Sequence, residues 1–190
     1  MRNERKSSSG IRTLWLGLAM TALVLFSGGC HRALWWHRLG EDLPLFGHRN
    51  WIVIADLAYP AQSRTGIETL YTDDDHLDVV KAVLEALEDT HHVRPIVYLD
   101  AELQAVTELD ARGITEYRGD LKDVLGARSF QTLPHDELIA KLDKAGEMFR
   151  ILILKTKSTL PYTSVFLELD CRYWSPEAEQ RLRAAIKPAK

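Results

Sequence analysis

The chain has 190 residues, of which 46% are hydrophobic and 27% are charged, a composition typical of one globular domain plus an extension. Its formal net charge is −3, so nothing in the charge balance favours nucleic acid as a partner. The sequence contains no internal repeat, zinc-type cysteine pair, phosphate loop, dinucleotide fingerprint or serine-centred elbow, so no motif points to the enzyme classes that these patterns identify.

Residues 1–30 have the pattern of an export signal. A basic stretch containing Arg2, Arg5 and Arg12 is followed by an apolar run over residues 14–26. This run has the length of a signal-peptide core and is too short for a full membrane span. Small residues and Cys30 close it.

The segment Ser27-Gly28-Gly29-Cys30 resembles the lipobox of bacterial lipoproteins, in which the cysteine is diacylated and becomes the new N-terminus. Leucine is the commonest residue three positions before that cysteine, and Ser27 stands there in this chain. We expect a lipidated Cys30 and a protein of the bacterial cell envelope, anchored to a membrane on its periplasmic or extracytoplasmic side. An uncleaved signal anchor and an ordinary cleaved signal are the alternatives. Cys171, the other cysteine, is then expected to be unpaired and buried.

Residues 31–44 join this signal to the domain, which covers residues 45–190. The joining segment is a linker or a short helix, and its apolar side chains argue against a plain flexible tether. They are Leu34, Trp35, Trp36 and Leu39. We favour packing of these side chains on the domain, and the alternative places them among lipid headgroups, where Trp is favoured.

Strands and helices alternate along the domain. Apolar runs without polar alternation predict buried strands. The predicted strands cover about 51–57, 93–99, 129–133, 149–155 and 161–169. Capping residues and apolar faces predict helices that begin after Thr72 or Asp73, at His135, and at Pro176 after Ser175. Residues 101–125 are polar and broken by glycines, and we expect a short helix and loops there. This order predicts a single α/β domain with a partly parallel central sheet and helices on both faces.

The first predicted strand begins just after His48 and ends at Asp56, with Pro60 in the turn that follows. Ligands of open α/β sheets bind at the carboxyl ends of the strands, and a carboxylate placed there needs a partner, solvent or a ligand. Capping of backbone groups by His48 and turn formation by Asp56 are the structural alternatives.

Gly47-His48 with Asp56 and Pro60 resembles the N-terminal signature of the D-ribose pyranase / L-fucose mutarotase (RbsD/FucU-like) family. Residues 67–87 resemble the next family segment, and His135 resembles a family histidine that lines the sugar pocket. Pro161-Tyr162-Thr163-Ser164 resembles the family's Pro-Tyr-x-Asn turn, with Ser164 in place of the asparagine. The resemblance covers most of residues 45–87 and 130–170.

This resemblance implies an isomerase that opens and recloses the ring of a free monosaccharide by general acid/base catalysis, with no cofactor and no metal. It implies His48 and Asp56 as catalytic residues, and His135, Tyr162 and Ser164 as residues that bind the sugar. A histidine suits this chemistry because both of its protonation states are accessible near neutral pH. Serine lacks the paired donor and acceptor of asparagine, so a sugar contact is lost or mediated by water. A non-catalytic sugar-binding or scaffold lipoprotein with the same fold is therefore the alternative.

Two further expectations concern metal binding and assembly. Asp73-Asp74-Asp75-His76 has the spacing of neither a calcium loop nor a zinc site, and it is interpreted as an acidic helix start.

The family forms stacked double rings with pockets shared between subunits. Stacked rings would point half of the lipidated N-termini away from the bilayer, and residues 31–44 span at most about 50 Å. We therefore expect a smaller homo-oligomer, such as a single ring, or a monomer.

Overall fold

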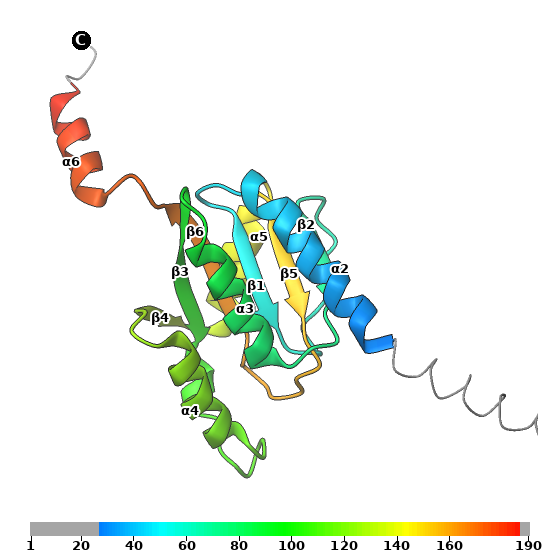
Figure 1. Cartoon of the computed structure of the whole chain (residues 1–190). Helices are drawn as coiled ribbons and strands as arrows, with labels where there is room; N and C mark the ends of the chain where they lie inside the picture. The colour runs from blue at the N-terminus through cyan, green and yellow to red at the C-terminus, as the bar shows by residue number, and fades with distance from the viewer. Residues whose placement is uncertain (1–26, 187–190) are drawn as a thin grey trace, which may run out of the picture.

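The computed structural model describes residues 27–186, and it describes side chains from residue 34 onward. Of the predicted signal segment over residues 1–30, residues 1–26 lie outside the described residues. The described chain forms one α/β domain around a six-stranded mixed sheet with the strand order β2-β5-β1-β6-β3-β4 (Figure 1). The predicted fold class is confirmed.

All strands of the sheet except β6 run in the same direction. The strands are β1 (Trp51–Ala55), β2 (Ile67–Tyr71), β3 (Val93–Asp100), β4 (Phe130–Leu133), β5 (Ile151–Lys155) and β6 (Val165–Cys171). The start of β6 therefore lies at the same edge as the carboxyl ends of the other strands, and we call this the carboxyl edge. The opposite edge, where β1 and β3 begin and β6 ends, is the amino edge.

Helices cover both faces of the sheet, as predicted. They are α2 (Ser27–Asp42), α3 (His76–Glu88), α4 (Ile114–Leu125), α5 (His135–Ala145) and α6 (Pro176–Ala185), with short 3-10 turns η1 (Leu43–Leu45) and η2 (Ala101–Gln104). Side chains of α2, α3 and α4 share one core with Ile52 and Ile54 of β1. Helix α5 packs on the other face, against Trp51 and Val53. Strand β1 is buried on both faces, which explains its continuous apolar sequence.

Three local details differ from the sequence predictions. The side chain that caps α3 is Asp75, which accepts from the Leu77 N–H, so neither Thr72 nor Asp73 is the cap. The last strand begins at Val165 and not at Pro161, because Tyr162 has a φ of 57° and interrupts the extended backbone. Cys171 is only half-buried and is unpaired.

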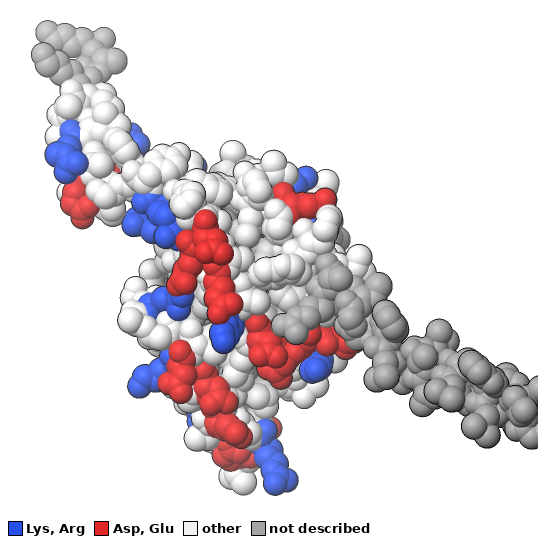
Figure 2. Space-filling model, in the orientation of Figure 1, with Lys and Arg blue, Asp and Glu red and all other residues white. Residues whose placement is uncertain are grey.

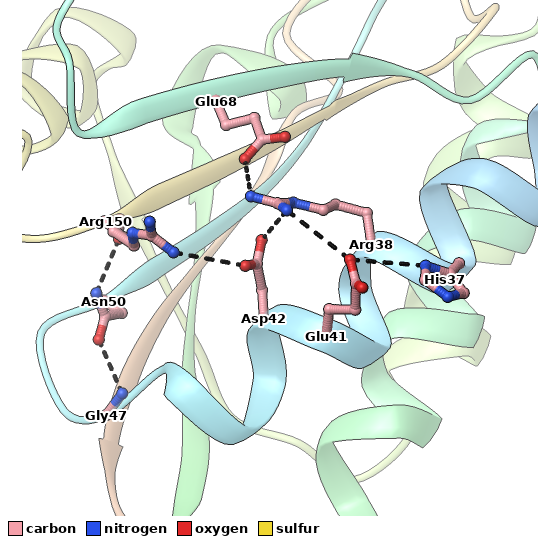
Figure 3. A network of polar contacts seen from close by, with 8 residues as sticks. All are labelled: His37, Arg38, Glu41, Asp42, Gly47, Asn50, Glu68 and Arg150. Atoms are coloured by element: carbon pink, nitrogen blue, oxygen red, sulfur yellow. Dashed lines mark hydrogen bonds and ion pairs between the residues drawn. The ribbon is translucent and has the colours of Figure 1, made fainter.

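Helix α2 belongs to the folded domain (Figure 3). Trp35 and Leu39 are 2% and 1% exposed in the core, whereas Trp36 is 47% exposed. Arg38 donates to Glu68 of β2 at 2.6 Å and lies 3.2 Å from the carboxylate of Asp42. Burial raises the pKa of Asp42, and Arg38 partly opposes that rise. The packing alternative for this segment therefore agrees with the structure at Trp35 and Leu39.

The two terminal helices relate differently to the domain. Helix α6 leaves the amino edge and stands away from the body of the domain (Figure 1), and it contributes no buried residue. Among the described helices, including α2, none combines the length and apolar character needed to cross a bilayer.

Candidate functional site

Polar side chains from separate segments meet at the carboxyl edge. Asp56 follows β1, Asp100 ends β3, and His135 begins α5 directly after β4. Tyr162 belongs to the loop that precedes β6. The parallel strands bring the first three to one edge, and the reversed direction of β6 brings the fourth.

The centre of this cluster is an ion pair between Asp100 and His135. Oδ1 of Asp100 lies 3.0 Å from Nδ1 of His135, and the Asp100 side chain is 0% exposed. Oδ2 of Asp100 is buried and has no hydrogen-bond partner among the described residues. Burial raises the pKa of Asp100 to about 6, His135 opposes the rise, and the negative charges of Glu102 and Asp56 add to it. Burial of a carboxylate with one unpaired oxygen lowers the stability of the folded state. Its presence here therefore favours a functional role over a purely structural one.

His135 is held in place from two sides. Its backbone N–H donates to the carboxylate of Glu102, at 3.1 and 3.0 Å, so η2 caps the start of α5. Its ring meets the ring of Tyr162 edge to face, with centroids 5.7 Å apart. With Nδ1 directed at Asp100, Nε2 has no partner among the described residues, and the side chain is 29% exposed. Nε2 is therefore the atom that can meet a ligand.

The other predicted site residues at this edge have different surroundings. Oδ1 of Asp56 accepts from the backbone of Ala58 at 2.8 Å, the turn role that was the structural alternative for this residue. Tyr162 is 40% exposed and its ring is open to a ligand. Ser164 is 1% exposed, and its enclosed Oγ has no hydrogen-bond partner among the described residues. Contact between Ser164 and a sugar would need a movement of the loop.

His48 lies at the amino edge, away from this cluster. It is exposed and lines a cavity of about 530 Å³ together with Arg49, Arg94, Trp174 and other residues between the sheet and α6. The whole of β1 separates His48 from Asp56. Within one chain, the structure therefore does not bring His48 and Asp56, the two predicted catalytic residues, together.

Asp100 and Glu102 were not identified from the sequence as site residues. The available signal was the one that identified Asp56, namely an acidic residue directly after an apolar strand. The pairing of Asp100 with His135 could not be predicted, because it depends on β3 and β4 being neighbours in the sheet.

The cluster can hold and move a proton. A carboxylate on Nδ1 fixes the tautomer of an imidazole and stabilises its protonated form, which leaves Nε2 able to accept or donate a proton. The pKa of Asp100, about 6, lies near physiological pH, so the protonated and the ionised form of this carboxyl group are both accessible there.

Comparison with known proteins identifies the fold. No protein-family model matches the sequence, and no curated protein matches it. RbsD from Bacillus subtilis complexed with D-ribose is similar in structure, with a TM-score of 0.50, 21% identity, and coverage of 70% of this chain and 91% of that chain. FucU from Bifidobacterium longum has a TM-score of 0.47 and 20% identity, with 70% and 93% of the two chains covered. The fucose mutarotase from Streptococcus pneumoniae, in complex with L-fucose, has a TM-score of 0.46 and 17% identity, with 68% and 89% covered. The chain therefore has the RbsD-like fold that the sequence motifs predicted.

Proposed function

We propose that this protein interconverts ring forms or anomers of a free monosaccharide, with His135 and Asp100 moving the proton. The observation that carries this proposal is the enclosed Asp100 carboxyl group, which has one oxygen on Nδ1 of His135 and the other unpaired. The fold shared with a ribose-bound structure supports a sugar as the ligand. We infer on the same grounds that the chain is a divergent relative of the RbsD/FucU-like family.

The reaction needs two proton movements at one carbon. A base removes the proton of the anomeric hydroxyl, the bond between the anomeric carbon and the ring oxygen breaks, and an acid protonates the ring oxygen. Ring closure on either face, or from another hydroxyl, gives the other anomer or ring size. Nε2 of His135 is placed to act as base or acid while Asp100 stabilises the imidazolium. Tyr162 offers a hydroxyl and an aromatic face, and Asp56 offers carboxylate oxygens to sugar hydroxyls.

His48 can take part only from a second copy of the chain. The amino-edge cavity is lined by His48 and three arginines, of which Arg94 is paired with Asp170 and Arg183 with Glu179. Acidic side chains gather over α4, beyond the carboxyl ends of the strands, with Lys and Arg side chains beside them (Figure 2). A head-to-tail contact, in which the amino edge of one copy meets the carboxyl edge of the next, would bring His48 to the Asp100–His135 pair of a neighbouring copy. In such a homo-oligomer, His48 would supply the second acid/base group.

Sugar binding without turnover is the second candidate, and the burial of Ser164 favours it. A hydroxyl that is enclosed in the free chain gives no ready contact to a substrate. In that case the protein binds a pentose or hexose and leaves its rate of ring opening unchanged.

Membrane attachment through a lipidated Cys30 is part of the proposal. Helix α2 begins at Ser27 and continues without a break to the docked Trp35 and Leu39. A lipid on Cys30 would therefore hold the domain close to the bilayer. Labelling of the full chain with a radioactive fatty acid is expected to be lost in Cys30→Ser and retained in Cys171→Ser. Labelling that persists in Cys30→Ser would contradict lipidation at this residue.

The proposed activity is tested by NMR exchange spectroscopy of anomer signals over a panel of free pentoses and hexoses. The expected result is faster exchange of at least one sugar in the presence of the full chain. Binding of a sugar with no change in its exchange rate would favour the non-catalytic alternative. No binding and no acceleration with any sugar would contradict both candidates.

A further inference from the structure

A buried hydrogen-bonded pair lies behind the loop that carries Tyr162. His76 at the start of α3 and Tyr117 in α4 are 2% and 7% exposed. Nδ1 of His76 lies 3.1 Å from the hydroxyl of Tyr117, and that hydroxyl donates to the backbone carbonyl of Thr163 at 3.0 Å. The rings of His76 and Tyr117 are also in edge contact, with centroids 5.7 Å apart.

The Thr163 carbonyl lies in the middle of the loop at the candidate site. Thr163 is itself fully buried, and its hydroxyl donates to the carbonyl of Leu160 at 2.8 Å. The residue before it, Tyr162, has the left-handed φ of 57°, which is unfavourable for a residue other than glycine. Such a conformation persists only where neighbouring contacts hold it, and the bond from Tyr117 is a contact of this kind.

The hydrogen-bond roles in this pair are fixed by counting protons. Tyr117 has one hydroxyl proton, and the Thr163 carbonyl can only accept, so Tyr117 donates to Thr163. When Tyr117 donates to Thr163, Nδ1 of His76 donates to the Tyr117 oxygen. Nε2 of His76 has no hydrogen-bond partner among the described residues. Burial lowers the pKa of His76 to about 4, so the ring stays neutral at neutral pH.

We propose that His76 and Tyr117 are positioning residues, which hold the Thr163 carbonyl and thereby set the ring of Tyr162 against His135. This proposal deepens the proposed function and rests on it for its catalytic consequence. The structural consequence, the position of the Tyr162 ring, does not depend on the protein having any activity. Helix α4 then has a defined role, since it supplies the tyrosine that reaches the loop from outside the sheet.

The test uses Tyr117→Phe in the full chain in detergent, with Tyr98→Phe as the matched control. Tyr98 is also a buried tyrosine, but its hydroxyl donates to Glu168 on the other face of the sheet, at 2.9 Å. The expected result for Tyr117→Phe is a shift of the ring NMR signals of Tyr162 and His135, and a loss of at least about 10-fold in kcat/KM, mostly in KM. Tyr98→Phe should leave both the ring signals and KM unchanged.

Two variants of His76 separate positioning from general stability. His76→Asn keeps a donor near the place of Nδ1, and it should retain the Tyr162 and His135 signals of the wild type. His76→Leu removes the donor and should move them. If Tyr117→Phe folds with wild-type ring signals for Tyr162, the positioning role is overturned. If the signals move while no sugar is turned over even by the wild type, the positioning role stands and the proposed function fails.

Discussion

The carboxylate of Asp100, at the end of β3, lies 3.0 Å from Nδ1 of His135, at the start of α5, and no part of that carboxylate side chain reaches solvent. Two consecutive loops of a parallel β-α arrangement thus produce an acid–imidazole pair with an open Nε2. The pair has an energetic cost, because burial raises the pKa of Asp100 to about 6.

Replacement of Asp100 by asparagine should stabilise the protein and slow the proposed proton transfer. The folded-state pKa is raised from 3.8 to about 6, so the wild type loses stability as pH rises through this window. At about pH 7.5 the neutral Asn should therefore raise the free energy of unfolding by on the order of 1 to 3 kcal/mol. Proton transfer should slow by about 100-fold or more.

Urea unfolding at several pH values and sugar exchange by NMR measure both effects. The exposed Asp123 of α4 provides the control, since Asp123→Asn should change neither quantity. An Asp100→Asn variant that is less stable than the wild type at neutral pH would show that the carboxylate serves the fold.

The buried neutral His76 should make stability depend on pH in the opposite direction. Its folded-state pKa is lowered from 6.5 to about 4, so its contribution is complete above pH 6.5 and is lost as pH falls toward 4. Relative to the non-titrating His76→Asn, the wild type should lose up to about 3 kcal/mol over this range. The contributions of other titrating groups cancel in the difference between the free energies of unfolding of the two proteins. A difference that stays constant from pH 7 to 4 would contradict a buried, neutral His76.

Helix α2 should contribute to the stability of the domain. Leu39 is 1% exposed, and Leu39→Ala should lower the free energy of unfolding by about 2 to 4 kcal/mol. Leu34 lies in the same helix and is 62% exposed, so Leu34→Ala should change the free energy of unfolding by less than about 0.5 kcal/mol. Equal effects of the two substitutions in thermal or urea unfolding would mean that α2 does not dock as described.

A site completed by two copies should be restored by mixing two inactive variants. His48→Ala and His135→Ala each remove one half of every site formed by a head-to-tail contact. Mixed in equal amounts with subunit exchange, they should recover about one quarter of wild-type activity, because one contact in four unites two intact halves. Mixtures that remain inactive, although native gels show mixed oligomers, would exclude a shared site.

The fold could be predicted from the sequence wherever burial dominated the choice of residues. The apolar runs that form β1, β3 and β5 have a neighbouring strand on each side in the sheet, and their residues are mostly buried. Strand β2 was recognised only as part of a family segment and not as a strand, because it is an outermost strand of the sheet and its residues are half-exposed. Helix α4 was equally hard to locate, since Gly119 and many polar residues obscure its apolar face.

The candidate site was predictable residue by residue but not as an assembly. His135 and Tyr162 were identified, and the structure brings their rings together. Asp100 was missed although it directly follows an apolar strand, as Asp56 does, and its pairing with His135 could not be predicted because it depends on β3 and β4 being neighbours in the sheet. His48 and Asp56, both predicted to be catalytic, stand at opposite ends of one strand, so they could meet at one site only if a second copy contributes one of them.

The most direct test of the proton-transfer role compares anomer exchange by NMR, for one accelerated sugar, with the wild type, His135→Asn and His91→Asn. His91 is exposed in the loop before β3 and serves as the matched histidine control. The account predicts that His91→Asn retains the wild-type rate and that His135→Asn falls to the rate of the sugar alone, while its circular dichroism spectrum is unchanged. A folded His135→Asn variant that still accelerates exchange as the wild type does would contradict it.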